Sequence, residues 1–448
     1  MVPINMGEDD YGGMGTSELL QHKRSRELEK TLSSLSFRLG KLLIESFRKP
    51  WLLILLPFTL PNLAYNYTRE RLGHKTYDTG ITNDSVGQYK RDCIVLFPTN
   101  GVGMGHFSRM YSLARSVRKI RPSTEIVFFT TNPVFHIIYS HSFVCYHIPG
   151  RKKFARMDPS TWNSLCEENL TNVFHLHKPS YFVFDGSYPY RGMLNAIKGF
   201  SQVDKVWVKR ISKSHALTSN IDAISHFDRV VIPGDYGELS PDDLSEWPID
   251  EINLAPPMLS ISRTDLYPRG EMRSRLGIPD DAIVALVSLG AGVINEIGEL
   301  RTFVCDCVTN KSAYVVLADS MLNPSRSTVD NNKVRMVREF PIMAYRNCFD
   351  FGIFAGGYNS VHEAHYLKLP SVIIPNRKTG SDDQVSRANL AAKETGGFIV
   401  INEEDYDLFD SAIDRICDES VRLEMIDSFS KSPPIIDGSP YIAEFLFS

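Results

Sequence analysis

Each half of this chain carries the same pattern: an apolar segment, then a glycine-rich turn, then an amphipathic helix. In the first half, CIVLFP at 93–98 leads into TNGVGMGH at 99–106. In the second half, IVALV at 283–287 leads into SLGAG at 288–292. Further apolar runs alternate with helical segments in both halves. Because this alternation is typical of parallel, doubly wound sheets, we predict an α/β fold with two Rossmann-like domains.

The length of 448 residues is sufficient for two such domains. A cluster of prolines around 251–269 separates the two series. We predict four segments, listed in chain order: a mobile segment at 1–30, an amphipathic helical extension and linker at 31–91, a first Rossmann-like domain at 92–258, and a second at 259–448. Paired domains of this kind enclose a cleft at the carboxyl ends of their strands, where ligands bind.

Charge and composition exclude several classes of protein. The formal net charge is -4, so the chain has no overall basic field to attract nucleic acid. Its seven cysteines include no CxxC pair, and no metal-ligand cluster with convincing spacing appears, so we predict a reducing cytoplasmic location and no bound metal. No apolar run reaches the ~18 residues of a membrane-spanning helix, and the first thirty residues do not resemble a signal peptide.

The segment 37–60 is basic and amphipathic. Its apolar residues Leu39, Leu42, Leu43 and Phe47 alternate at helical spacing with the basic residues Arg38, Lys41, Arg48 and Lys49. The run WLLILL at 51–56 follows, too short to cross a bilayer but suited to its interface. We predict membrane contact through Arg38, Lys41, Phe47, Trp51 and Leu52. The alternative, a helix packed on the adjacent domain, stays open.

The turn at 99–106 is the strongest local signal in the first half. Its glycines let the backbone approach a ligand, and the amides that open the next helix favour an oxygen-rich or anionic group. The dinucleotide fingerprint GxGxxG is not met, because His106 takes the place of the third glycine, so NAD is disfavoured. At the first turn of a helix, His106 is a candidate general base. A capping or core histidine is the alternative.

Two helix starts in the second half suit a diphosphate. SLGAG at 288–292 and FAGGYNSVHE at 354–363 each end a strand and open a helix. Glu363 has two interpretations: it caps Ser360 in a capping box, or it binds the diol of a ribose. Asp383 and Gln384, in a polar loop after a strand, are suited to sugar hydroxyls; the alternative is an ordinary helix start capped by Ser381 or Asp382.

Taken in order, these motifs resemble the GT-B glycosyltransferases of the MurG-like group, which use UDP-sugars. The likeness covers roughly 92–445 and rests on GVGMGHFSR, SLGAG, AGGYNSVHEAHYLKLPSVIIPN and DDQVSRANLA. The resemblance implies donor-binding roles for Gly290, Ala291, Gly292, Phe340, Gly357, Asn359, Ser360, Glu363, Asp383 and Gln384. It also implies that Gly103, Gly105 and Arg109 contact the acceptor, and that His106 is the catalytic base.

The resemblance implies an inverting, metal-independent transfer from a UDP-sugar to a hydroxyl. The loop at 101–106 departs from the family's usual Gly-Gly-Thr-Gly-Gly-His, so the acceptor of MurG itself is not carried over. We expect a lipid-linked or cell-envelope glycan acceptor and a peripheral position on the inner face of the membrane. The alternatives are a UDP-sugar hydrolase or 2-epimerase of the same fold, or a non-catalytic sugar-nucleotide-binding subunit. A hydrolase or epimerase uses no lipid acceptor, so it leaves the basic amphipathic segment unexplained. The presence of His106 and of both glycine-rich loops in one chain argues against the subunit.

Overall fold

The computed structural model describes most of the chain. The described residues are 24–25, 27–71, 90–99, 103–151, 157–210, 221–237, 252–290, 297–321, 331–377 and 382–448. Most of the predicted mobile segment at 1–30, the linker part of 31–91, and the predicted donor ligands Ala291 and Gly292 lie outside these ranges.

The first domain is built on a parallel seven-stranded sheet with the order β3-β2-β1-β4-β5-β6-β7. Its strands are β1 (Arg91–Pro98), β2 (Glu125–Thr130), β3 (Val144–His147), β4 (Pro179–Asp185), β5 (Asp204–Val208), β6 (Arg229–Pro233) and β7 (Ile252–Ala255). Its helices are α4 (Gly105–Ile120), α5 (Phe135–Ser140), α6 (Pro159–His177), α7 (Arg191–Lys198) and α8 (Ile221–Ile224). The inner strands are continuously apolar because helices cover both faces of the sheet.

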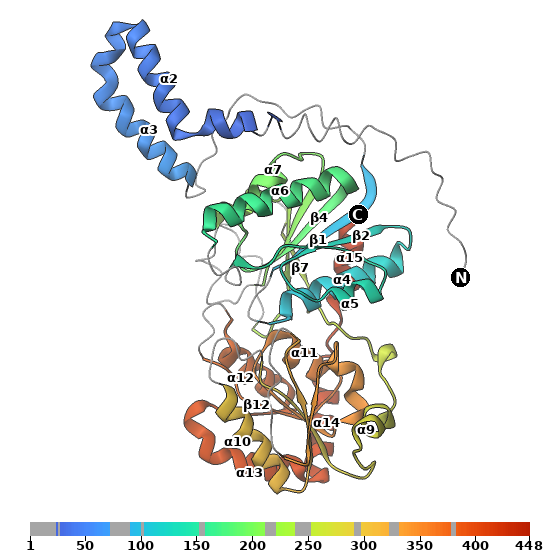
Figure 1. Cartoon of the computed structure of the whole chain (residues 1–448). Helices are drawn as coiled ribbons and strands as arrows, with labels where there is room; N and C mark the ends of the chain where they lie inside the picture. The colour runs from blue at the N-terminus through green and yellow to red at the C-terminus, as the bar shows by residue number, and fades with distance from the viewer. Residues whose placement is uncertain are drawn as a thin grey trace.

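The second domain has a parallel six-stranded sheet with the order β10-β9-β8-β11-β12-β13. Its strands are β8 (Val284–Ser288), β9 (Tyr314–Ala318), β10 (Val334–Val337), β11 (Phe351–Phe354), β12 (Ser371–Ile373) and β13 (Phe398–Val400). Its helices are α9 (Arg269–Leu276), α10 (Ile297–Asn310), α11 (Tyr358–Tyr366), α12 (Gln384–Thr395), α13 (Phe409–Cys417) and α14 (Glu419–Lys431). The predicted α/β architecture of two doubly wound domains is confirmed (Figure 1).

The last helix, α15 (Gly438–Leu446), requires a correction to the predicted domain boundaries. The second domain was predicted to include everything from 259 to 448, but α15 packs on α4 of the first domain. Its residues Ile442, Ala443 and Leu446 join the core on the α4 face of the first sheet. The Ser439 hydroxyl lies 2.8 Å from that of Ser112 on α4. The chain therefore returns to the first domain at its end and ties the two domains together.

The extension forms a helical hairpin that stands away from both domains (Figure 1). It consists of α2 (Leu35–Arg48), a short 3₁₀ turn (Pro50–Leu55) and α3 (Leu56–Arg71). Arg38 on α2 makes a two-pronged ion pair with Glu70 on α3, at 3.1 and 2.5 Å, and is buried there. The prediction that Arg38 contacts a membrane is therefore wrong, because its guanidinium holds the two helices together.

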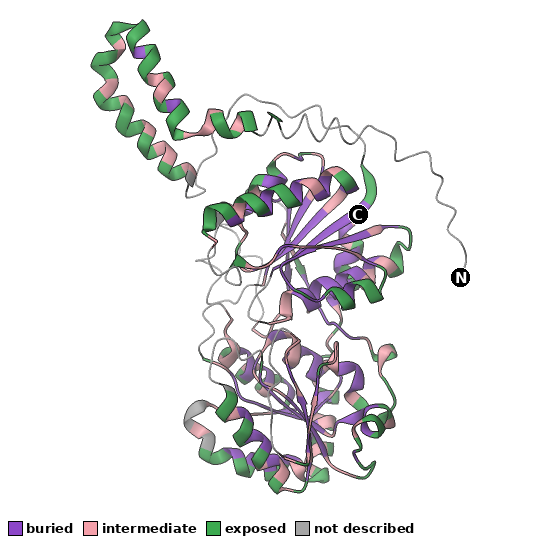
Figure 2. Cartoon of the chain, viewed as in Figure 1, coloured by how far each residue is buried: buried purple, intermediate pink, exposed green. Residues whose placement is uncertain are grey.

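The base of the hairpin is attached to the first domain. The guanidinium of Arg191, at the start of α7, donates to the backbone carbonyl of Glu70 at 3.3 Å. Lys30, in the helical residues 27–33 that precede α2, approaches Glu167 on α6 to 3.9 Å. In the part of the chain that the structure describes, the alternative of a helix packed along its domain is not observed, since many apolar side chains of the hairpin are exposed (Figure 2). Among the described residues, no helix combines the length and apolarity needed to cross a bilayer.

Candidate active site

A histidine and an aspartate meet where the first sheet faces the second domain. Strand β4 lies beside β1, with Asp185 in register with Pro98, so the end of β4 lies next to the turn that opens α4. His106 is the second residue of α4, and its Nδ1 is 2.7 Å from Asp185 Oδ1. A terminal nitrogen of Arg109 also lies 2.9 Å from His106 Nδ1. Because an ionised carboxylate only accepts hydrogen bonds and makes the shorter contact, we assign the proton to Nδ1, which leaves Nε2 as the basic nitrogen.

Arg109, one turn further along α4, fixes the aspartate. Its Nε and one terminal nitrogen each donate to an oxygen of Asp185 at 2.8 Å. Burial raises the pKa of Asp185, but the adjacent Arg109 and His106 outweigh it and hold that pKa below the usual value. Arg109 was predicted to contact the acceptor. Since its side chain is buried against Asp185, we correct this role to one of positioning.

Burial dominates the ionisation of His106. It lowers the pKa of the imidazole below its usual value, and the nearby Asp185 only partly opposes this. The side chain nevertheless keeps 16% of its surface exposed, so a substrate can approach it. The site thus holds a neutral imidazole at neutral pH, with one nitrogen oriented by a carboxylate and the other able to take a proton.

Asp185 was missed by the sequence analysis. It follows the apolar run 181–184 and precedes Gly186, so it lies at the carboxyl end of a predicted strand. An acidic residue at that point of a parallel sheet is a recognisable signal. The glycine-rich turn alone does not reveal Asp185, because its contact with His106 depends on the pairing of β4 with β1.

The start of α11 in the second domain lies against this pair. Tyr358, its first residue, donates to the carbonyl of Gly234 at 2.9 Å, and its ring is surrounded by three guanidinium groups. These belong to Arg109, Arg210 and Arg387, at 5.5, 5.0 and 5.8 Å from the ring centre. Because Arg109 touches both Asp185 and the Tyr358 ring, the histidine site and the amino end of α11 face each other across the domain boundary.

Ion pairs across the boundary hold the charged groups of this cleft. Arg387 on α12 lies 2.7 Å from both Asp235 and Asp382, and Arg210 of the first domain lies 3.2 Å from Asp382. Burial raises the pKa of Asp382, but the two arginines lower it far below the usual range. Carboxylates held ionised in this way link the two domains around the site.

The predicted diphosphate ligands lie at the start of α11. Gly357 is the N-cap of this helix, and Asn359 and Ser360 are in its first turn. The Oδ1 atom of Asn359 is buried and has no hydrogen-bond partner, although buried polar atoms are normally paired. Gly290 follows β8 in the left-handed region, with φ of 88°. These positions leave backbone amides available to an anionic group, whereas the Asn359 oxygen suits a ligand that donates a hydrogen bond. Their role in binding the donor stays a prediction.

Asp383 and Gln384 stand at the start of α12. Asp383 is the N-cap of this helix and accepts from the amide of Ser386 at 3.0 Å. The alternative cap, Asp382, is instead engaged in the ion pairs described above, and Ser381 lies outside the described residues. Gln384 Oε1 accepts from the amide of Asn376 at 3.2 Å. Both side chains therefore have structural partners, and their predicted contact with the sugar is not tested by the structure.

Glu363 is a buried residue of α11, whereas the sequence suggested either a capping role with Ser360 or contact with a ribose. Helix α11 begins at Tyr358 with Gly357 as its cap, so Ser360 and Glu363 do not form a capping box and that alternative is wrong. The carboxylate instead accepts hydrogen bonds from the backbone amide and the hydroxyl of Ser260, at 3.1 and 2.5 Å. Burial raises the pKa of Glu363 to about 7. Its contact with a ribose stays a prediction.

The remaining predicted residues lie on both sides of the boundary. Gly103 and Gly105 flank Met104, the N-cap of α4. Phe340, which precedes the 3₁₀ helix Ile342–Cys348, packs on α4 of the first domain. Its ring centre is 5.5 Å from that of Phe107 and 5.2 Å from that of Tyr111. Phe340 therefore lines the boundary next to the helix that carries His106.

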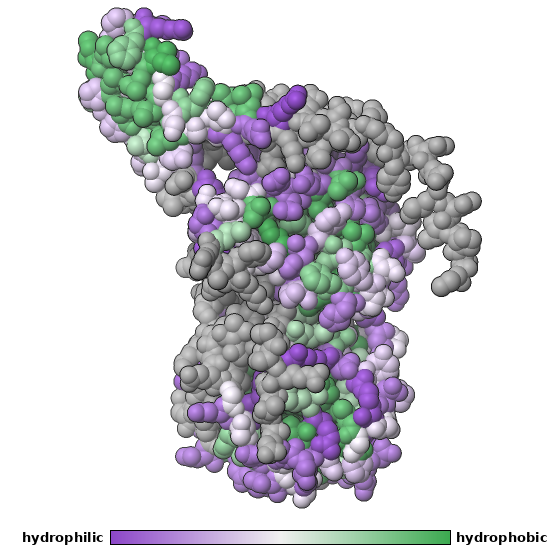
Figure 3. Space-filling model, in the orientation of Figure 1, coloured by the Kyte–Doolittle hydropathy of each residue, from purple (hydrophilic) through white to green (hydrophobic). Residues whose placement is uncertain are grey.

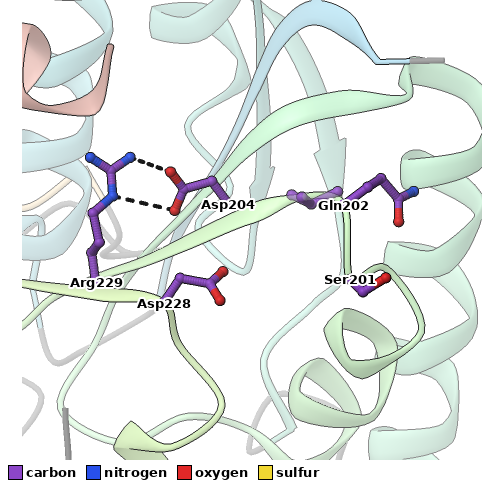
Figure 4. Close-up of a pocket in the computed structure, with 6 residues that line it drawn as sticks. Ser201, Gln202, Asp204, Asp228 and Arg229 are labelled. Carbon is purple, nitrogen blue, oxygen red and sulfur yellow. Dashed lines mark hydrogen bonds and ion pairs between the residues drawn. The ribbon is translucent and has the colours of Figure 1, made fainter. Parts of the chain in front are cut away.

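A shallow pocket at the amino ends of strands β5 and β6 is not part of this site. Its lining residues are Ser201, Gln202, Val203, Asp204, Asp228 and Arg229 (Figure 4). Arg229 is paired with Asp204 and also donates to the carbonyls of Phe445 and Leu446 at 2.7 and 3.1 Å. These polar groups anchor the end of the chain, at the amino ends of the strands.

Comparison with known proteins identifies the architecture. No protein-family model matches the chain, and no curated protein sequence matches it either. Among solved structures, a glycotransferase of kitacinnamycin aligns with a TM-score of 0.53 and 13% identity over 79% of this chain and 98% of its own length. A UDP complex of MnaA from S. aureus gives 0.54, with 13% identity over 79% and 94%.

The spinosyn forosaminyltransferase SpnP gives a TM-score of 0.52, with 12% identity over 79% of this chain and 99% of its own length. The chain has a GT-B fold. The resemblance to GT-B glycosyltransferases is thereby confirmed as a likeness of fold. In the aligned parts, this protein is only 12–13% identical to these structures, so their substrates are not assigned to it.

Proposed function

We propose that this protein is a glycosyltransferase that moves a sugar from a UDP-sugar to a hydroxyl of a lipid-linked or cell-envelope glycan. The observation that carries the proposal is the neutral His106, oriented by Asp185 and facing the amino end of α11 in a GT-B fold. A base on one side of the cleft and an anion-binding helix end on the other are the two parts that such a transfer requires.

In the proposed reaction, His106 Nε2 accepts the proton of the acceptor hydroxyl while the oxygen attacks the anomeric carbon. The bond from that carbon to the UDP oxygen breaks as the new bond forms on the opposite face, so the configuration inverts. Asp185 keeps its negative charge and stabilises the imidazolium through the Nδ1 proton. The proton therefore passes from the hydroxyl to His106, and the bonding electrons leave with UDP.

The start of α11 supports the departure of UDP. A helix carries partial positive charge at its amino end and presents free amides there, which favour an anionic group. Gly357, Asn359 and Ser360 occupy this end, and the first amides of the helix have no partner within the helix. We propose that the developing negative charge of the diphosphate is stabilised here, without a requirement for a metal ion.

The hairpin supports a peripheral position on the cytoplasmic face of a membrane. Its exposed apolar side chains include Phe47, Trp51, Leu53, Ile54, Leu55 and Phe58. Figure 3 shows hydrophobic residues gathered over the hairpin, in contrast to the mixed surface of the domains. Lys41, Arg48 and Lys49 are exposed on the same hairpin, and a combination of apolar and basic side chains binds anionic lipid surfaces. Trp51 is suited to the interface, and Leu52 is half-buried beside it.

The attachment of the hairpin gives this position a function. Its base contacts α6 and α7 of the first domain, the domain that carries His106. Docking of the hairpin would therefore hold the histidine domain at the membrane, where a lipid-linked acceptor resides.

Incubation with a panel of UDP-sugars, with and without a membrane lipid extract, tests the proposal. A transferase gives UDP together with sugar covalently attached to lipid or glycan, detected by mass spectrometry. Free sugar released equally without lipids would indicate a hydrolase, an epimeric sugar would indicate an epimerase, and binding without turnover would indicate a subunit. His106→Gln serves as the control, since any product it forms at the wild-type rate does not come from the proposed site.

A further inference from the structure

Three side chains near the amino ends of β1 and β2 form a cluster that the proposed reaction does not use. Cys93 on β1 lies directly beside Glu125 on β2 in the parallel register, and His177 is the last residue of α6. One ligand atom from each, the thiol sulfur, a carboxylate oxygen and an imidazole nitrogen, lies within 4.8 Å of the other two. The cluster is at the end of the strands opposite to Asp185.

The three groups are held in place by their surroundings. His177 Nδ1 is 2.9 Å from Glu125 Oε1, and His177 Nε2 is 2.8 Å from the phenol oxygen of Tyr146. Cys93 is fully buried, whereas the Glu125 side chain is 28% exposed, although its Oε2 atom is buried. Arg91 reaches Glu125 only to 3.8 Å and is itself half-exposed, so it is free to turn outward. The cluster is thus ordered and largely enclosed, and Glu125 is its most exposed member.

We propose that Cys93, Glu125 and His177 bind a zinc-class divalent cation, with water as the fourth ligand. Thiolate, imidazole and carboxylate are the ligands that Zn²⁺ takes in proteins, usually four in a tetrahedral arrangement. The separation of the three ligand atoms permits one ion to reach all of them after small side-chain shifts. Cys₁His₁Glu₁ sets with a single open position keep that position available to water.

Tyr146 supports this assignment because it provides the outer contact that a metal-bound histidine needs. A ligating imidazole donates its other N–H to a neighbouring acceptor, which fixes its orientation. When the ion occupies Nδ1, the imidazole proton resides on Nε2 and is donated to the Tyr146 oxygen already 2.8 Å away. The Cys93 thiol releases its proton to solvent, so about one proton leaves for each ion bound. The charges of the thiolate and carboxylate balance that of the ion.

The site would tie β1, β2 and the end of α6 together. These elements support the face of the domain to which the hairpin is attached, since Glu167 on α6 contacts Lys30. An ion that binds only the folded protein raises its resistance to unfolding by mass action. We therefore assign the ion a structural role, remote from His106.

Cobalt titration of the full chain, after removal of metals with a chelator, tests the site. Wild type is expected to bind one Co²⁺ with a thiolate-to-cobalt absorption band. Cys166→Ser is the matched control, because Cys166 is a buried cysteine of the same domain outside the cluster. The band should persist in this variant, disappear in Cys93→Ser, and require at least ~10-fold more cobalt in His177→Gln.

A second measurement keeps the test independent of the buried thiol. Glu125 is partly exposed, so Glu125→Gln is expected to fold, and Zn²⁺ should raise the melting temperature of wild type and of Cys166→Ser but not of Glu125→Gln. Binding without a thiolate band, a band that survives Cys93→Ser, or equal Zn²⁺ stabilisation of Glu125→Gln would overturn the proposal. UDP binding and transfer are not involved, so a failure here leaves the proposed function unaffected.

Discussion

The hairpin and the two domains treat apolar side chains in opposite ways. In the first domain, the apolar residues of β1 are fully buried between helices on both faces of the sheet. In the hairpin, Phe47, Ile54 and Phe58 are 76%, 76% and 74% exposed, whereas the buried side chains of α2 are Arg38 and Ser46 (Figure 2). The domains are thus organised around an apolar core, and the hairpin around an ion pair with its apolar surface outward.

This inversion indicates what the hairpin is for. Leaving apolar surface in water costs about 25 cal/mol for each Å², and large contiguous apolar patches on proteins mark interaction sites. A hairpin that packed on its own domain would have buried these side chains. Since many of its apolar side chains are exposed among the described residues, this surface remains for a partner, and the basic residues beside it favour an anionic membrane.

The largest expected effect is on catalysis, from substitutions in the first domain. His106→Gln should lower kcat about 10²- to 10⁴-fold, because the base is removed. Asp185→Asn should lower it comparably, since the imidazole then loses the partner that fixes its tautomer. Transfer assays measure both, and UDP affinity and vesicle binding are expected to match wild type. Full activity of His106→Gln would place the base elsewhere.

The pH dependence of the same site has a definite direction. Because burial lowers the pKa of His106, the base form persists below the usual titration range of histidine. The value of kcat/KM should therefore fall with decreasing pH only below about pH 6.5. A fall centred above that value would show that the imidazole is not held neutral.

The next effect is on the hairpin. Replacing Phe47, Ile54 and Phe58 together by glutamate should weaken binding to anionic vesicles about 10²-fold or more, since each buried apolar side chain contributes about 1.5–3 kcal/mol. Vesicle co-sedimentation measures this. Deleting 31–75 should release the protein altogether while UDP binding persists.

The matched control for the hairpin is Leu176→Glu. Leu176 is an exposed apolar residue on α6 of the first domain, so its replacement adds charge without touching the hairpin. Unchanged vesicle binding of the triple variant, or an equal loss in Leu176→Glu, would remove the special role of the hairpin surface.

A smaller effect, on the pH dependence of the free energy of unfolding, is expected from Glu363→Gln in the core of the second domain. The folded pKa of Glu363 is raised to about 7, so wild type loses stability as pH rises from the unfolded value near 4.5 through 7. Glutamine carries no such cost. The free energy of unfolding of the variant should therefore exceed that of wild type by about 3 kcal/mol at pH 9 and match it near pH 4.

Chemical denaturation of both proteins across this range measures the difference. A constant difference at all pH values would mean that the carboxylate is not buried in the folded chain. UDP titration of the same variant tests the ribose contact separately, because loss of that contact lowers affinity without changing the pH dependence of stability.

The smallest effect is expected from Lys41→Ala. One exposed lysine near an anionic bilayer contributes about 1 kcal/mol, so binding should weaken roughly fivefold on anionic vesicles and remain unchanged on neutral ones. Equal weakening on both would show that Lys41 supports the hairpin itself rather than its contact with lipid.

The sequence predicted what local pattern determines. Strand, turn and helix alternation predicted both sheets, and the position of His106 followed from the glycine-rich turn. Contacts between distant segments were not accessible in this way. Asp185 becomes the partner of His106 only because β4 pairs with β1. Arg38 has the sequence context of a surface cation, but in the folded hairpin it is paired with Glu70 on the neighbouring helix. Glu363 likewise pairs with Ser260, 103 residues earlier, which no local spacing indicates.

Calorimetric titration of UDP into wild type and His106→Gln, combined with a transfer assay on the same samples, tests the central claim most directly. The account predicts equal UDP affinity in the two proteins and transfer by wild type alone. No detectable affinity for UDP in wild type, or transfer that persists in the variant, would contradict it.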